Sequence, residues 1–298
     1  MSNNPLINVF DRFDLTDEED IDILLFRDAH FNGDFDLMIK YLEDNDVCDF
    51  RNERIEYLQK VEISLGHDLA PLLLSTEAAE QVAKSRQSYI QLRTVYEDPL
   101  LENSITRLIA DLILSEANEL NNAMDALIIY GNNATSSLIK LIQDDRFYSP
   151  FFPGYGKAPV NAIICLGKIA DPSSIPYLFS LYGKIEEEAS ITNALYEIGD
   201  SSKQFLLKIL SNRPIAQDTT HAALALAAFA EDKEVISAVF SEISLLIHSK
   251  DCMLLSYLSN ICCDTDNMVQ RSFFKKEIVP KLPEKIRNTF TIIVRNWH

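Results

Sequence analysis

Histidine, cysteine and carboxylate side chains carry most protein catalysis and metal binding, but in this chain their spacing forms no known catalytic motif. His67 is followed by Asp68, a pair that also occurs in metal-dependent phosphohydrolases. A lone His-Asp lacks the further ligands that a metal needs, so we interpret the pair as a surface or helix-capping feature. The acidic run 186–188 is interpreted as a solvated helix start, where negative charge complements the helix dipole.

The five cysteines are irregularly spaced and include no CxxC pair. Zinc sites and disulfide frameworks need regular pairs, so we expect reduced thiols that fill the core. A redox pair at Cys262 and Cys263 is the alternative, although adjacent cysteines rarely form a strain-free bridge. No P-loop, GxGxxG or GxSxG motif occurs. The sequence therefore predicts no catalytic residue, metal or cofactor, although catalytic carboxylates need no motif and there are 45 acidic residues.

The whole chain has a net charge of −18, and the negative charge is concentrated in its first half. Residues 1–149 carry 29 acidic and 12 basic side chains, whereas residues 150–298 carry 16 and 15. The last 28 residues reverse the sign, with seven basic and two acidic side chains. Such a field repels nucleic acid and anionic membranes and attracts a basic protein surface. The alternative is that the acidic residues serve only solubility.

The composition favours an all-α protein. Hydrophobic residues make up 47 %, which is enough for a packed core, and 8 Gly with 11 Pro provide little turn chemistry for an all-β fold.

No segment approaches the run of about 20 apolar residues that a membrane span needs. The N-terminus lacks the basic and apolar regions of a secretory signal, so we expect a cytoplasmic protein.

An internal repeat is the clearest pattern in the sequence. One leucine position recurs at spacings of 39, 29, 31 and 32 residues, at Leu127, Leu166, Leu195, Leu226 and Leu258. A second apolar residue follows three positions later, at Tyr130, Ile169, Ile198, Phe229 and Ile261. Next comes a small residue, which we expect to end the first helix of each pair where a bulky Cβ would obstruct the turn. A polar residue follows in four of the five units, and Asp171 and Asp200 are predicted to cap the second helix.

The segment AIICLGKIADPSSIPYLFSLY (162–182) resembles the short HEAT-like repeat of the phycobilisome-lyase type. That repeat typically reads Ala-x-x-Leu-Gly-x-Ile-x-Asp-Pro-x-x-Ile-Pro-x-Leu, and the resemblance covers roughly residues 120–270. It implies an α-solenoid, because a helix pair of about 30 residues cannot bury both faces without stacked neighbours. It implies little about activity, because the family has many functions.

Three enzymatic branches of this family can be compared with the residues. The deoxyhypusine hydroxylase branch needs repeated His-Glu pairs, and no histidine here precedes a glutamate, which excludes that activity. The DNA-glycosylase branch binds DNA through basic residues. The net charge of −18 argues against this activity. The bilin-lyase branch has diffuse sites and stays open. It predicts a ligand-sized pocket lined by polar groups.

We divide the chain into an acidic helical N-terminal region or cap (1–115), HEAT-like repeats (116–270) and basic closing helices (271–298). Thr16 and Glu19 form a predicted capping box ahead of a helix that ends near residue 31. Further helical stretches in the first region are expected at 35–44, 51–65, 76–97 and 100–116. The closing helices are expected to be separated by Pro280 and Pro283.

An inserted loop, DDRFYSPFFPGYGKAP (144–159), separates the first two repeat units. It contains five aromatic residues, and a long aromatic loop in a helix stack either packs on the surface or binds a partner. The candidate partner-binding residues are Asp144, Asp145, Phe147, Tyr148, Phe151, Phe152 and Tyr155. The alternative is that these rings fill a gap between repeats.

Three functions remain on the sequence alone. The first is a non-catalytic acidic adaptor or inhibitor, resembling an immunity protein or effector regulator, that captures a basic protein partner. The second is a scaffold subunit of a larger or self-associated complex, in which the basic C-terminal helices meet the acidic N-terminal region of a neighbour. The third is a lyase-like enzyme.

Overall fold

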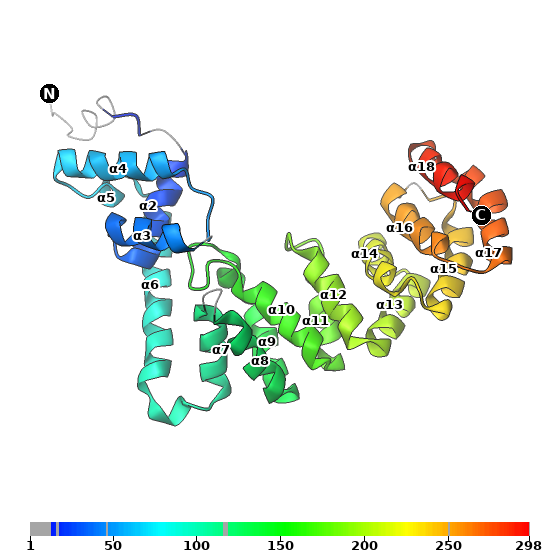
Figure 1. Ribbon diagram of the computed structural model, residues 1–298, viewed down its shortest axis with the longest axis horizontal. Coiled ribbons are helices and arrows are strands. Elements are labelled where there is room, and N and C mark those ends of the chain that lie inside the picture. Colours follow the sequence, from blue (N-terminus) through cyan, green and yellow to red (C-terminus); the bar gives the residue numbers. More distant parts are fainter. Residues whose placement is uncertain (1–12, 16–17, 46, 116–118, 250, 298) are drawn as a thin grey trace. The chain divides into compact units, whose positions relative to one another are not determined.

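The computed structural model describes residues 13–15, 18–45, 47–115, 119–249 and 251–297. These residues form helices and connecting turns and include no β-strand, which confirms the predicted all-α class (Figure 1). The chain divides into two compact units. Unit 1 comprises residues 1–130 and 136–162, and unit 2 comprises residues 131–135 and 163–298.

This division differs from the predicted boundaries at residues 115 and 270. It falls within α9 (Asn132–Ile142) and α10 (Ala158–Ile169), so the inserted loop 144–159 belongs to unit 1. The first repeat helix, α8 (Leu120–Tyr130), also belongs to unit 1. The basic residues 271–298 form part of unit 2 and are not a region of their own.

The first helices of unit 1 lie where the hydrophobic periodicity predicts them. They are α2 (Glu18–Phe31), α3 (Phe35–Asp44), α4 (Asn52–Leu65), α5 (Ala70–Leu73), α6 (Thr76–Glu97) and α7 (Ile105–Leu114). The predicted stretches 35–44 and 76–97 coincide with α3 and α6. The stretch predicted at 100–116 is shorter as a helix because Pro99–Leu101 forms a 3-10 turn and Ser104 then caps α7. The helices α6 and α7 form a hairpin (Figure 1).

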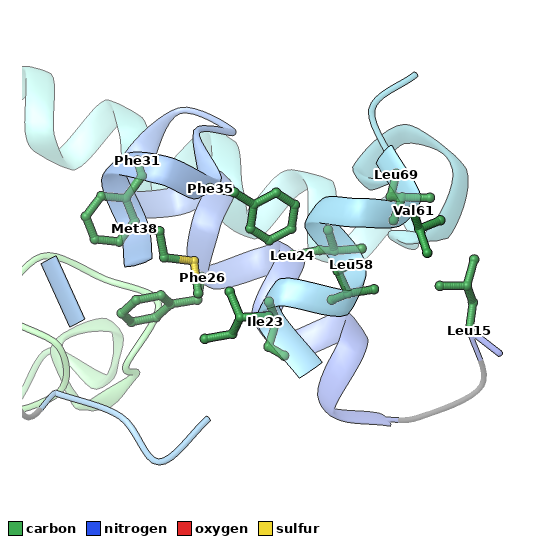
Figure 2. Packing of buried hydrophobic residues seen from close by; sticks show 11 residues of the cluster. Leu15, Ile23, Leu24, Phe26, Phe31, Phe35, Met38, Leu58, Val61 and Leu69 are labelled. Carbon is green, nitrogen blue, oxygen red and sulfur yellow. The ribbon is translucent and has the colours of Figure 1, made fainter. Parts of the chain in front are cut away.

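The core of unit 1 is built around α2, against which α3, α4, α5 and α6 all pack. Ile23, Leu24 and Phe26 of α2 are fully buried, and they lie close to Met38 of α3 and Leu58 of α4 (Figure 2). Burying a side chain of this size contributes about 1.5–3 kcal/mol. These long-range contacts hold the irregular helices of unit 1 together.

Arg27 is the charged exception in this core, since its side chain has no exposed surface. Its guanidinium donates to three carboxylates at 2.5 to 2.7 Å, those of Asp28, Glu62 and Asp68. Asp68 also accepts a hydrogen bond from the amide of Ala70 at 2.9 Å. The N-cap of α5 is Leu69, which makes no side-chain capping bond, so Asp68 of the His-Asp pair serves chiefly as a partner of the buried Arg27. Removing one partner from such a buried group costs about 3–5 kcal/mol, so the cluster fixes how α2 meets α4.

The helices of unit 2 pack in the order of the sequence, from green to red in Figure 1. They are α11 (Ile175–Phe179), α12 (Glu188–Ile198), α13 (Asp200–Asn212), α14 (Ala216–Leu226), α15 (Lys233–Leu246), α16 (Cys252–Cys263), α17 (Met268–Phe273) and α18 (Glu284–Arg295). From α11 to α17 most helices contact the next, and α12, α13 and α14 also contact the helix two places further on. Short 3-10 turns at Pro172–Ser174 and Ala227–Phe229 precede α11 and follow α14.

The repeat seen in the sequence corresponds to a packing position. All five leucines of the repeat are fully buried, at Leu127, Leu166, Leu195, Leu226 and Leu258. The second apolar position varies more, from 38 % exposed at Tyr130 to fully buried at Ile261. The first position therefore carries most of the regular packing.

The small residue ends its helix in three units. The predicted reason was that a bulky Cβ would obstruct the turn, but the observed reason is a positive φ angle. Gly131, Ala170 and Gly199 have positive φ angles of 65°, 59° and 83°. A Cβ at Gly199 would meet nothing within 4 Å, so backbone conformation and not space selects glycine there. Ala230 keeps a helical φ of −62° and Cys262 lies inside α16, so the last two units turn differently.

One predicted helix cap is confirmed and another is wrong. The side chain of Asp171 accepts a hydrogen bond from the amide of Ser173 at 2.9 Å, as expected. Asp200 is the first residue of α13 and makes no capping bond; its carboxylate instead pairs with Lys203 one turn later. The cap proposed at Thr16 lies outside the described residues.

The C-terminal region follows the predicted pattern of helices interrupted by proline. The helix α17 continues into a π-helical turn, Phe274–Ile278, and a 3-10 turn, Val279–Lys281, that contains Pro280. Pro283 then precedes α18.

Candidate functional site

The backbone of the predicted binding loop, residues 144–159, passes close to other backbone at two glycines, once at α7 and once within the loop itself. At Gly154, where φ is +86°, a Cβ would lie 2.8 Å from the carbonyl oxygen of Ile113. At Gly156, where φ is +77°, a Cβ would lie 2.9 Å from the carbonyl oxygen of Tyr148. A side chain fits neither position, so the loop can follow this path only with glycine there.

Three rings of the loop pack into unit 1, and one of them, Phe151, lies against the same buried cluster as Tyr155. Phe152 is only 3 % exposed. The ring of Tyr155 lies 4.6 Å from that of His30, 5.7 Å from that of Tyr41 and 5.8 Å from that of Phe26, measured between centroids. These distances are typical of aromatic packing, which contributes about 0.5–1.5 kcal/mol beyond buried area.

His30 connects α2 both to the loop and to α6. Its Nε2 lies 2.8 Å from the carbonyl oxygen of Pro150, which can only accept, so Nε2 carries the hydrogen. Its Nδ1 then accepts a hydrogen bond from the hydroxyl of Tyr89 at 2.7 Å. Burial lowers the pKa of His30 from 6.5 to about 4, so the ring is neutral at pH 7. The histidine thus acts as a structural tie for the loop.

The two acidic members of the predicted site have different environments. Asp144 accepts hydrogen bonds from the guanidinium of Arg146 at 2.6 and 2.8 Å, and this pairing lowers the pKa of the carboxyl group. Arg146 therefore balances the charge of Asp144. Asp145 is exposed.

The structure therefore separates the predicted site residues into two groups. Phe151, Phe152 and Tyr155 belong to the packing of unit 1, and the gap that they fill lies against the N-terminal helices and not between repeats. Phe147 and Tyr148 are half-buried. The prediction of a partner-binding loop rests on these two rings and on the two aspartates.

Unit 2 contains a polar hollow of about 1230 Å³ that the sequence did not single out. It lies at the starts of α15 and α17, beside the end of α12. Its lining includes Tyr196, Phe229, Glu231, Lys233, Asp264 and Asp266, so that four carboxylates, with Asp232, outnumber one lysine.

Part of the lining of the hollow is aromatic and apolar. Tyr196 is 53 % exposed, and its ring centroid lies 5.2 Å from that of Phe229. Three alanines at positions 227, 228 and 230 complete this part. Such a lining accommodates the methylene stem of a lysine or arginine, and an exposed aromatic face attracts a cation.

Two carboxylates of the hollow already have partners. Asp232 accepts a hydrogen bond from the amide of Glu234 at 2.8 Å, which caps α15, and another from Nζ of Lys203 at 2.9 Å. Asp266 lies 3.3 Å from the guanidinium of Arg271. These two acids therefore contribute to the stability of unit 2.

The other two carboxylates, those of Glu231 and Asp264, form no ion pair with a lysine or arginine in the described part of the chain. Burial, and then the negative charge of Glu231, raises the pKa of Asp264. A cation placed between them would relieve this repulsion. The hollow is therefore suited to a positively charged group.

The repeat contains a weak signal for this hollow. Glu231 occupies the polar position that follows the small residue, and Asp264 comes one residue after the corresponding Cys263. Their convergence on one hollow depends on how α15 and α17 stack, which the spacing does not reveal.

Neither a metal site nor a disulfide is associated with these residues. In the described ranges, no group of His, Cys, Asp and Glu side chains is arranged to hold a metal ion. Cys262 and Cys263 are both free thiols, and burial raises the pKa of Cys263 to about 12. Across the same ranges, no helix combines the length and apolar character needed to cross a membrane.

No family model, curated protein or solved structure matches the chain. The class of protein is therefore defined by the molecule itself: an all-helical protein with an aromatic loop packed on unit 1 and an acidic hollow in unit 2.

Proposed function

We propose that this chain is a non-catalytic protein-binding module, an acidic adaptor or inhibitor that captures a basic protein partner. The observation that carries the proposal is the hollow of unit 2, which Glu231 and Asp264 line together with Tyr196 and Phe229. A lysine or arginine of a partner would place its charge between the carboxylates and its stem against Tyr196. The proposed location in the cytoplasm rests on the sequence alone.

We further propose that the helices of unit 2 form a HEAT-like α-solenoid. Polar side chains meet at one repeat spacing, since Lys168 donates to Glu197 at 2.8 Å, 29 residues later. Lys203 donates to Asp232 at the same spacing. Helices one repeat apart also approach closely, because a Cβ on Gly167 of α10 would lie 2.7 Å from Cα of Ala194 in α12. These contacts support a stack of similar helix pairs.

The charge distribution supports electrostatic attraction of the partner. Unit 1 contains 29 acidic and 13 basic residues, a net charge of −16, and unit 2 contains 16 and 14, a net charge of −2. The field of unit 1 would accelerate the encounter with a basic protein, whereas the hollow would provide the close contacts. Among the predicted binding residues of the loop, Asp145 is the one that is exposed to a partner.

The enzyme alternative receives one supporting observation, because a lyase-like activity requires a ligand-sized polar pocket and the hollow is one. Its carboxylates favour a cationic ligand over an anionic one. Binding of a protein segment remains the proposal, since Lys and Arg side chains satisfy this preference without a cofactor.

The proposal can be tested by titrating a fluorescent peptide of alternating Lys and Ala into the full-length protein. The variant Glu231→Gln with Asp264→Asn should bind about tenfold more weakly, because it loses two charge-assisted contacts. The matched control is Glu186→Gln with Glu187→Gln, which removes two exposed charges of unit 2 outside the hollow. Equal losses in the two variants would show that only net charge matters and would contradict the proposed site.

A further inference from the structure

The outer face of α17 is apolar and exposed, which is unusual beside a well-packed core. Met268 is 67 % exposed, Val269 78 % and Phe273 41 %. Two shallow hollows lie on either side of these residues; one includes Ser272 and Lys276, and the other includes residues of α15. The next residue, Phe274, is fully buried, so the exposed side chains form one distinct face. Grouped exposed apolar residues often mark an interaction surface.

This face has a basic border. Lys275 and Lys276 are exposed in the π-helical turn that follows α17, and residues 271–298 contain seven basic and two acidic side chains. Two acids flank this face, and both are paired: Glu277 with Lys281 at 3.3 Å, and Asp266 with Arg271 at 3.3 Å. A partner for the face should therefore combine an apolar contact with carboxylates.

Unit 1 presents a surface of the complementary chemistry. A shallow hollow at the start of α3 and the end of α4 includes Asp34, Asp36 and the side chain of Ile63, which is 74 % exposed. Glu62 also lines it, but its charge is balanced by Arg27. The surrounding sequence strengthens the negative field, since residues 1–50 contain 14 acidic and three basic side chains. We call this surface the α3–α4 hollow.

We propose that the α17 face of one copy docks on the α3–α4 hollow of a second copy of this chain. Ile63 would pack against the apolar residues of α17, and Lys276 would lie opposite Asp36. A symmetric contact between two α17 faces would instead bring lysines together, which like-charge repulsion disfavours. Because the two surfaces differ, each bound copy leaves one of each free, and association continues as a ring or chain.

The test is a charge swap measured by analytical ultracentrifugation of the full chain over a range of concentrations. The wild-type mass should rise with concentration at low salt and return to that of a monomer at high salt. Lys276→Glu and Asp36→Lys should each weaken association about tenfold, because each places like charges in contact. Both positions are exposed, and equal thermal melts would show that the variants fold.

Mixing the two variants provides the specific result. Glu at position 276 of one variant then meets Lys at position 36 of the other, and the opposite contact has its native residues, so association should recover to near the wild-type level. A wild-type chain that stays monomeric would overturn the proposal. Single variants without effect, or a mixture that fails to recover, would also overturn it, because the pairing of these two surfaces would then be wrong.

Discussion

The carboxylates of Glu231 and Asp264 come from turns of successive helix pairs and line the same hollow. Burial, and then the charge of Glu231, raises the pKa of Asp264. Burial and the mutual repulsion of two carboxylates reduce stability at neutral pH, and binding sites often carry such a cost. The pair therefore connects the stacking of unit 2 with its proposed function.

Replacing Asp264 by Asn should separate stability from binding. A carboxyl group with a raised pKa stabilises the folded state below its unfolded pKa, and this contribution is lost as pH rises through the folded pKa. At neutral pH the variant should therefore melt slightly higher, on the order of 1 °C, while it binds the Lys-Ala peptide more weakly. Glu186→Gln should leave both properties unchanged. A lower melting temperature for Asp264→Asn would contradict the proposed repulsion.

The stability of unit 1 should depend on pH through His30. Because the folded pKa is about 4 and the ordinary value is 6.5, the unfolded chain binds more protons between these values. Stability should fall as pH decreases from 6.5 to 4, by at most about 1.4 kcal/mol per pH unit from this group. The side chain of His30→Gln can still donate to the carbonyl of Pro150 and accept from the hydroxyl of Tyr89. The variant therefore keeps both hydrogen bonds but has no titrating group at this position. Urea unfolding at several pH values should show a flatter profile for this variant, and identical profiles would contradict the assignment.

The turn between α12 and α13 should require glycine. Gly199 has φ of 83° and ψ of −133°, a region that side chains rarely adopt, so Gly199→Ala should lower the unfolding free energy by about 1–3 kcal/mol. Ala170 occupies the equivalent position with φ of 59°, and Ala170→Gly should be neutral or stabilising by at most about 1 kcal/mol. Urea unfolding of both variants measures the contrast. A destabilised Ala170→Gly would show that its methyl group contributes more by packing than it costs in conformation.

Phe152→Ala should destabilise unit 1 rather than act only on binding. The side chain is 3 % exposed, and truncation of a buried Phe costs about 3–5 kcal/mol. Asp145→Asn in the same loop should leave thermal stability unchanged, because the residue is exposed. Circular dichroism melts would show the difference. A Phe152→Ala variant as stable as the wild type would mean that the loop does not depend on this ring.

Local sequence patterns predicted many of the helices but not how they are grouped. The apolar spacing placed α3 and α6 at their observed bounds, and the recurrent leucines identified a buried position in five helices. The unit boundary was missed because the loop 144–159 returns to α2 through Tyr155 and His30, a contact between residues more than 100 positions apart. Composition marks such a loop as aromatic but does not show which side its rings face.

The candidate site shows the same limit. The polar turn position was visible at Glu231, yet Asp200 at that position pairs with Lys203 and lies outside the hollow. A carboxylate remains open for binding where no lysine or arginine of the chain pairs with it, and the position of the acid in the repeat does not determine this.

Hydrogen exchange of the full-length protein with and without the Lys-Ala peptide locates the surface that the peptide contacts. We expect slower exchange in two separate segments that line the hollow, residues 227–237 and 264–270. Protection confined to the loop 144–159 or to unit 1, or no protection anywhere, would contradict the assignment of the hollow as the site that binds a basic partner.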